Sequence, residues 1–163
     1  MSILSDSAIL EINNLKSRYP QGKQKSALLP ALHIAQAEKG WLPVDAMDEV
    51  AGILQIKPIE VYEVATFYTM FHVKPVGKYV IEVCRTGPCC TIGAEELIQY
   101  MEDKLGISVG ETTDDGLFTL KTVECLAACG MGPVLQIGPD YTYRENMTRE
   151  KFDLMIEELR NKS

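Results

Sequence analysis

The sequence has no long apolar run and no excess of positive charge. A membrane-spanning helix needs about 18–20 consecutive apolar residues, and the most apolar candidate, residues 64–73, is ended by Lys74. With 16 Lys and Arg against 23 Asp and Glu, the formal charge is −7. Because phosphate affinity depends on clustered basic side chains, this balance argues against nucleic-acid binding. We expect a chain that is soluble and binds no nucleic acid.

Targeting and nucleotide-binding motifs are also missing. The opening residues, MSILSDSAILEINNLK, have neither the basic start and apolar core of a secretory signal nor the Arg-rich, acid-free composition of a transit peptide. We therefore expect a reducing cytosol, where structural disulfides are uncommon. The sequence contains no G-x-G-x-x-G after a predicted strand and no Walker-type loop. We expect no nucleotide or flavin site on this chain.

The first 75 residues have the patterns of short helices separated by proline and glycine. Helices are expected over residues 5–19, 25–40, 41–56 and 57–71. The candidate caps are Ser5, Asp6 or Ser7 for the first helix and Ser26 and Gly40 for the two ends of the second. Since apolar residues recur at helical spacing, we predict a helical bundle over residues 1–75, with a linker at 72–78.

From Lys78 onward the pattern changes to alternating strands and helices. Strands are expected over residues 78–84, 117–125, 134–138 and 141–145, and helices over 91–106 and 148–162. This order predicts a thioredoxin-like α/β domain over residues 76–163, with a parallel crossover after the first strand. The whole chain is then of the α+β class. Residues 78–163 hold 9 basic and 15 acidic side chains. We interpret this acidic excess as a solvated face or as a surface that docks on a basic partner.

All five cysteines lie in two short segments. Three share CRTGPCC at residues 84–90, and two are in CLAAC at residues 125–129. Cys84 and Cys125 are expected at the ends of two strands, with Cys89 and Cys129 in the loops that follow. If these strands are neighbours in one sheet, a C-x4-C pair and a C-x3-C pair meet at the same edge.

The residues by themselves leave several interpretations of these cysteines open. Unrelated buried thiols would rarely form two tight pairs, and a redox dithiol favours C-x-x-C, which this chain lacks. A structural zinc ion takes paired cysteines, usually two residues apart. A [2Fe-2S] cluster spreads its thiolates over two irons and suits wider loops, and glycines let N–H groups approach its sulfurs. The spacing favours the cluster. A Rieske-like role for His33 and His72 is unnecessary with four cysteines, so we expect core or surface roles for them.

The two cysteine segments together resemble a known family. CRTGPCC followed by ECLAACGMGPVLQIG is similar to the thioredoxin-like [2Fe-2S] subunit of NADH:quinone oxidoreductase (respiratory complex I), the 24 kDa or E subunit. The same module serves NAD-linked hydrogenases and formate dehydrogenases. Upstream, GWLP and VYEVATFYTMF are similar to that family's helical N-terminal region, so the resemblance covers nearly the whole chain.

The resemblance implies one [2Fe-2S] cluster with four cysteine ligands. They would be Cys84, Cys89, Cys125 and Cys129. The chain departs from the family pattern at small residues, with Ala127 in place of Gly and Gly132-Pro133 in place of Ala-Pro, and these changes are not expected to affect ligation.

Two further residues of the first cysteine segment each allow two interpretations of their role. Cys90 is not needed by the family. We interpret it as an inert buried thiol at a helix start, with a stand-in ligand as the alternative. Arg85 is interpreted as a solvated charge or as a cation that raises the cluster potential.

The resemblance also implies what the chain does and with what. It would be an oxidoreductase subunit that transfers single electrons and has no catalytic residue or NADH site of its own, because hydride chemistry belongs to a flavin. FMN and NADH are expected on the 51 kDa (F) subunit, as a heterodimer within a larger complex. Residues 1–75 would be a docking domain, and the complex would lie on the cytoplasmic face of the bacterial inner membrane, in a peripheral arm.

Other functions remain open. The chain could be the equivalent subunit of an NAD-linked hydrogenase or formate dehydrogenase. From different classes, it could be a structural-zinc interaction module or a thiol–disulfide enzyme of the thioredoxin class.

Overall fold

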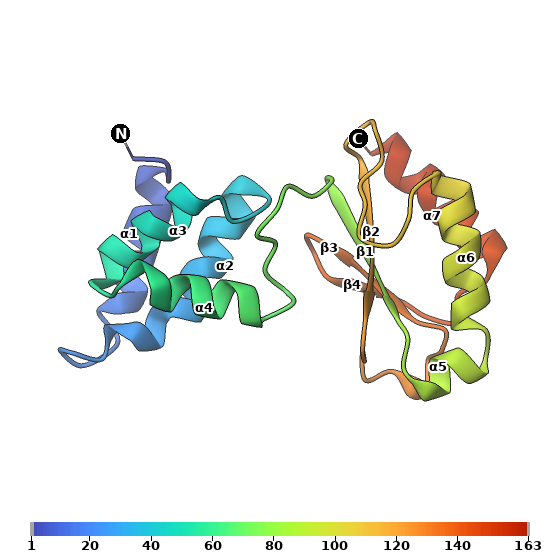
Figure 1. Ribbon diagram of the computed structural model, residues 1–163, viewed down its shortest axis with the longest axis horizontal. Helices are drawn as coiled ribbons and strands as arrows, with labels where there is room; N and C mark the ends of the chain where they lie inside the picture. The colour runs from blue at the N-terminus through green and yellow to red at the C-terminus, as the bar shows by residue number, and fades with distance from the viewer. Residues whose placement is uncertain (1, 163) are drawn as a thin grey trace. The chain divides into compact units, whose positions relative to one another are not determined.

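The computed structural model of the chain describes residues 2–162 (Figure 1). The chain divides into two compact units, Met1–Pro75 and Val76–Ser163. The first is entirely helical, and the second contains a four-stranded sheet with helices. Across residues 2–162, no helix has the length and apolar character that crossing a membrane requires.

Four α-helices and one 3-10 helix form the first unit. They are α1 (Asp6–Lys16), η1 (Gln24–Ala27), α2 (Leu28–Lys39), α3 (Val44–Leu54) and α4 (Pro58–Phe67). Ser5 is the N-cap of α1, as predicted, and its hydroxyl accepts the N–H of Ala8 at 3.2 Å. Gly40 ends α2 at φ 78°, a conformation that favours glycine. Ser26 was predicted wrongly as a cap: its N–H already donates to Lys23 within η1, and α2 begins later.

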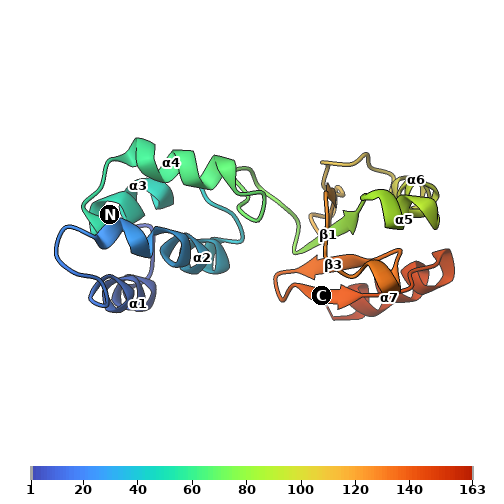
Figure 2. The same cartoon turned by 90° about the horizontal axis from the view of Figure 1, so that it is seen from below.

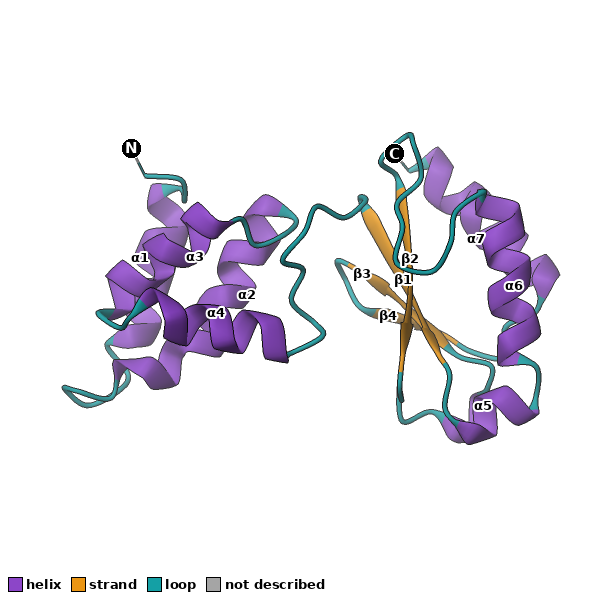
Figure 3. Cartoon of the chain, in the orientation of Figure 1, coloured by secondary structure: helices purple, strands orange, loops and turns teal. Residues whose placement is uncertain are grey.

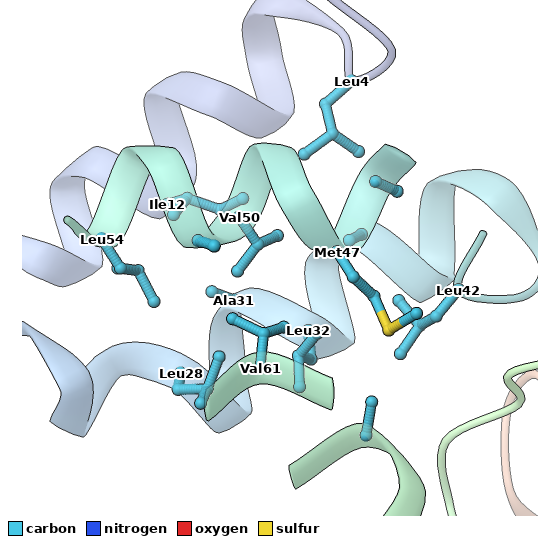
Figure 4. Close-up of a cluster of buried hydrophobic side chains, with 14 of the residues drawn as sticks. Leu4, Ile12, Leu28, Ala31, Leu32, Leu42, Met47, Val50, Leu54 and Val61 are labelled. Carbon is cyan, nitrogen blue, oxygen red and sulfur yellow. The ribbon is translucent and has the colours of Figure 1, made fainter. Parts of the chain in front are cut away.

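The core of the first unit is built from one apolar face of each helix. Ile12 of α1, Leu32 of α2, Val50 of α3 and Val61 of α4 are all fully buried, and Figure 4 shows them among the side chains that fill the space between the helices. This is the arrangement that helical apolar periodicity predicts. The fourth helix ends earlier than predicted, and the side chain of Phe67 at its end is 78% exposed.

The second unit contains a sheet with strand order β2-β1-β3-β4 (Figure 3). Its elements are β1 (Tyr79–Cys84), α5 (Gly87–Thr91), α6 (Ala94–Leu105), β2 (Phe118–Val123), η2 (Cys129–Met131), β3 (Leu135–Gly138), β4 (Thr142–Arg144) and α7 (Arg149–Asn161). Strand β1 pairs parallel with β2 and antiparallel with β3, and β3 pairs antiparallel with β4. The predicted parallel crossover is confirmed. Helix α5 was predicted as loop; Pro88 in its first turn fits a helix start.

Side chains alternate between the two faces of the sheet. Ile81 of β1 and Leu120 of β2 share a core with Phe152 of α7, and Figures 1 and 2 show α6 and α7 on the same side of the strands. Glu82 and Cys84 alternate with Ile81 along β1 and therefore point to the opposite face, yet both are buried. The candidate site begins on this second face.

Candidate metal centre

The end of β1 brings both cysteine segments to one edge of the sheet. Cys84 is the last residue of β1 and lies in register with Val123, the last residue of β2. On its other side, the N–H of Cys84 donates to the carbonyl of Val134 at 3.0 Å. Because the parallel strands β1 and β2 end at the same edge, the loops that follow them lie side by side (Figure 3). The predicted meeting of residues 84–90 and 125–129 is thereby observed.

Two of the four candidate ligands are buried and two are exposed. Cys84 is 2% exposed and Cys89, on α5, is 1% exposed. Both belong to a small core with Leu126. Cys125 and Cys129 are exposed, and each of these cysteines is a free thiol. The site therefore has one side sealed from water and one side open to it.

The buried cysteines are close neighbours. Cys84 and Cys89 belong to the same small core, and each thiol shifts the pKa of the other. Cys129 lies near enough to Cys89 for its charge to raise the pKa of the Cys89 thiol. The structure thus brings three of the four predicted ligands to one place.

The segment around Cys125 wraps the sulfur of Cys84. The carbonyl of Glu124 lies 3.7 Å from the Sγ of Cys84, and the N–H of Leu126 donates to the same sulfur. The Sγ of Cys125 itself accepts the N–H of Ala127 at 3.3 Å. Both chain neighbours of Cys125 therefore touch the buried pair, while its own sulfur lies at the exposed side.

Backbone N–H groups shape the protonation of the buried pair. Burial raises the pKa of the Cys84 thiol, but donation from Thr86, Leu126 and the Cys89 thiol lowers that pKa by more, so it falls below its ordinary value. Burial and the contact with Cys84 raise the pKa of Cys89, against a smaller opposing effect of the Val134 N–H. N–H groups aimed at sulfur stabilise the thiolate, the form that binds metal.

The donors at this end of the sheet are all cysteines. A tetrahedral zinc site draws its ligands onto one ion, whereas a [2Fe-2S] cluster distributes cysteine thiolates over two irons. A buried pair of thiols with two exposed thiols on the adjoining loop is a donor set that fits the cluster.

Cys90 points away from the buried pair. Its Sγ lies 3.3 Å from the carbonyl of Arg85 and 3.6 Å from a carboxylate oxygen of Glu95. Arg85 forms an ion pair with the same Glu95 at 3.5 Å. Burial and the neighbouring carboxylate raise the pKa of Cys90. The prediction that Cys90 is buried is wrong: consecutive residues on a helix point about 100° apart, so only Cys89 faces the core.

The two histidines have the structural roles predicted for them. His33 is exposed on α2, and its ring packs against Phe71 with centroids 5.0 Å apart. His72 is buried, and its N–H donates to the side chain of Gln36 at 2.7 Å. Both lie in the first unit.

Tyr143 supports the site but was not predicted from the sequence. The hydroxyl of Tyr143, on β4, donates to the carbonyl of Leu126 at 3.0 Å and so anchors the loop that carries the second cysteine pair. No local pattern marks Tyr143 for this role, because the contact spans 17 positions of sequence and depends on the pairing of β3 with β4.

A sheet of this topology, with paired thiols and sulfur-directed N–H groups at its edge, defines an iron–sulfur protein of thioredoxin-like fold. Residues 12–160 match the family of thioredoxin-like [2Fe-2S] ferredoxins, and the chain belongs to that family. Its cofactor is accordingly one [2Fe-2S] cluster.

Individual relatives agree with this assignment. The chain is 47% identical over 150 residues to the E 2 subunit of NADH-quinone oxidoreductase from Rhizobium meliloti (strain 1021), covering 92% of this chain and 87% of the relative. It is 48% identical over 145 residues to the E subunit of NADH-quinone oxidoreductase from Rickettsia felis, covering 88% and 86%. A solved structure of an NAD+-reducing [NiFe]-hydrogenase has the same fold, with a TM-score of 0.73 at 22% identity, over 83% of this chain and 22% of that one.

Proposed function

We propose that the chain is the electron-transfer subunit of an NADH:quinone oxidoreductase. In this proposal it exchanges one electron at a time with the FMN of a partner flavoprotein, the 51 kDa (F) subunit, with which it forms a heterodimer. The support is the near-complete coverage of relatives named as E subunits of that enzyme, at 47% and 48% identity, together with the edge site described above. NADH and FMN belong to the partner, and this chain carries no catalytic residue.

The proposed ligands divide the work of the site. Cys84 and Cys89 would hold the buried side and exclude water from it, and Cys125 and Cys129 would hold the side open to a partner. The [2Fe-2S] cluster, when bound, supplies one-electron transfer without bonding to substrate. Thr86 and the residues of the second loop contribute N–H groups that favour thiolate and tune the potential.

The helical bundle of residues 1–75 is proposed as a docking domain. Helix α4 exposes Ile59 (56%) and Phe67 (78%), and Tyr68 beyond its end is 39% exposed. Aromatic side chains are enriched in the cores of protein interfaces, so this face suits a partner protein. The acidic residues of 78–163 would form a further contact with a basic partner surface.

Placement follows from the proposed complex. A chain of which residues 2–162 contain no membrane-crossing helix would reach the membrane only through its partners. We propose the peripheral arm of the complex, on the cytoplasmic face of the bacterial inner membrane.

Metal analysis with EPR tests the cluster part of this proposal. Anaerobically purified protein should contain two irons per chain and give a low-temperature S = 1/2 signal after dithionite reduction. Cys84→Ser and Cys125→Ser should each lose or alter the visible spectrum. One zinc without iron would instead support a structural-zinc interaction module, and a colourless, metal-free protein a thiol–disulfide enzyme.

A second host complex has weaker support. The fold shared with the hydrogenase chain fits an equivalent subunit of an NAD-linked hydrogenase or formate dehydrogenase, but at 22% identity it supports only the fold. Co-purification of the tagged chain separates the hosts: quinone reductase activity with NADH supports the first, and hydrogenase or formate dehydrogenase activity the second.

A further inference from the structure

A charged side chain lies inside the central strand beside the site. Glu82 of β1 is 3% exposed, although its neighbours Ile81 and Val83 are apolar core residues. Acidic side chains are almost never fully buried unless they are paired. The position of Glu82 therefore requires a partner.

Its partners form one row across the sheet. Glu82 is in register with Lys121 on β2 and with Gln136 on β3. The ammonium of Lys121 lies 3.4 Å from one carboxylate oxygen, and the side-chain amide of Gln136 donates to the other at 2.6 Å. Both oxygens of the carboxylate are thus satisfied, and Glu82 sits as a paired anion within the sheet.

Fold stability alone does not call for this pair. Removing two charges from water costs several kcal/mol per ion, and replacing a buried ion pair by well-packed apolar residues is often neutral or stabilising. An apolar side chain at position 82 would continue the pattern of its strand. The row therefore points to a use for the charge.

The row lies directly beside the proposed ligand Cys84. Residues two apart on a strand share a face, so the side chains of Glu82 and Cys84 project from the same face, with Cα atoms about 7 Å apart. Both are sealed from water. In such surroundings a charge acts more strongly than it does at the surface.

We propose that Glu82 and Lys121 set the reduction potential of the [2Fe-2S] cluster through their opposed charges, Glu82 lowering it and Lys121 raising it. The inference rests on the proposed ligation by Cys84. Reduction adds one negative charge beside Glu82, so the carboxylate disfavours the reduced state. Lys121 offsets this effect, and Gln136 holds the carboxylate in place.

Two substitutions that each remove one charge test the proposal through opposite shifts. Glu82→Gln removes the negative charge and should raise the potential, and Lys121→Gln removes the positive charge and should lower it. Each should change the equilibrium constant for reduction about tenfold, which is about 59 mV for one electron. The double variant should return close to the wild-type value. The measurement is a mediated dithionite titration of the reconstituted full-length chain, followed by visible absorption and EPR.

Asp115→Asn is the matched control. Asp115 is also an ion-paired carboxylate, 3.0 Å from Arg160, but it precedes β2, whose length separates it from the Cys84 end of the sheet by about 17 Å. Its removal should leave the potential unchanged. Raising salt to about 0.5 M should leave the Glu82 and Lys121 shifts in place, because buried pairs are screened much less than exposed ones.

The outcomes separate this inference from the function it rests on. Shifts of the same sign, or shifts no larger than that of Asp115→Asn, would overturn it. Loss of the cluster in both variants, with lowered thermal stability of the apoprotein, would assign the row a purely structural role and also overturn it. If Cys84→Ser kept the wild-type spectrum, the ligand assignment would fail instead. If Cys84→Ser lost that spectrum while the potentials stayed fixed, only the role of Glu82 and Lys121 would fail.

Discussion

A Cβ atom added to Gly132 would lie 3.2 Å from the Sγ of Cys89. The same atom would lie 2.7 Å from the Cδ1 of Ile92, the far end of a flexible and half-exposed side chain. A side chain at position 132 is limited by space and not by backbone conformation, since the φ of Gly132 is −74°. The absence of a side chain leaves room beside one of the two buried sulfurs.

Gly132→Ala should be accommodated by movement of Ile92. The family pattern that the chain resembles has Ala-Pro where this chain has Gly132-Pro133, and the atom nearest to the added Cβ is the far end of the Ile92 side chain. Iron content and the EPR signal should therefore be kept, at a stability cost of about 1–3 kcal/mol that an added Ile92→Ala should reduce. Gly130→Ala is the control, because a Cβ at Gly130 meets nothing within 4 Å. Loss of iron from the Gly132 variant alone would show that the Cys89 sulfur, and not Ile92, is displaced.

Cys90→Ala should leave the cluster intact. The Cys90 thiol is directed at Arg85 and Glu95 and not at the buried pair, so its removal should keep iron content, visible spectrum and EPR signal unchanged. Cys89→Ala is the matched comparison on the same helix and should lose the cluster. Loss of iron from the Cys90 variant alone would show that Cys90, and not Cys89, is the ligand.

The first unit should lose stability in acid through Glu38. The ion pair with Lys39 and hydrogen bonds from Ser5 lower the pKa of Glu38 from 4.5 to about 2. Because the folded pKa is the lower one, ionised Glu38 stabilises the folded state above pH 4.5, and this contribution disappears as the pH falls towards 2.

Urea midpoints at several pH values check this prediction. Glu38→Gln should have a lower midpoint than the wild type at neutral pH, and the difference should vanish near pH 2. The effect should be small and should weaken with salt, since both side chains of the pair remain in contact with water. Glu11→Gln, on the exposed side of α1, serves as control. A difference that persists unchanged in strong acid would rule out the carboxylate charge as its cause.

Phe152 should be the most sensitive position of α7. Its ring is fully buried and packs edge-on against Tyr100, with centroids 6.3 Å apart. Phe152→Ala should cost about 3–5 kcal/mol of unfolding free energy. Leu154→Ala, on the same helix but 66% exposed, should change it by less than about 0.5 kcal/mol. Circular dichroism during urea titration compares the two, and equal losses would refute the assigned packing.

Local patterns in the sequence determined most of the element order. Caps such as Ser5 and Gly40 act on their own helix ends, and alternation within a strand is a property of a few consecutive residues, so both can be predicted without tertiary contacts. The spacing of the cysteines likewise indicated a shared metal centre. The cap prediction failed at Ser26, because this residue lies inside a 3-10 helix that precedes α2.

Only the tertiary structure decided which cysteines are buried and which side chains surround them. Spacing cannot tell that Cys89 is sealed from water while Cys90 faces Glu95, because the core on one side of α5 sets that orientation. The contact of Gly132 with Cys89 and the row from Lys121 through Glu82 likewise join residues that are distant in sequence. Local propensity acts over a few residues, whereas burial and pairing arise when strands β1, β2 and β3 come together. The sequence by itself therefore determined which residues belong to the site, and the packing of the sheet determined what surrounds them.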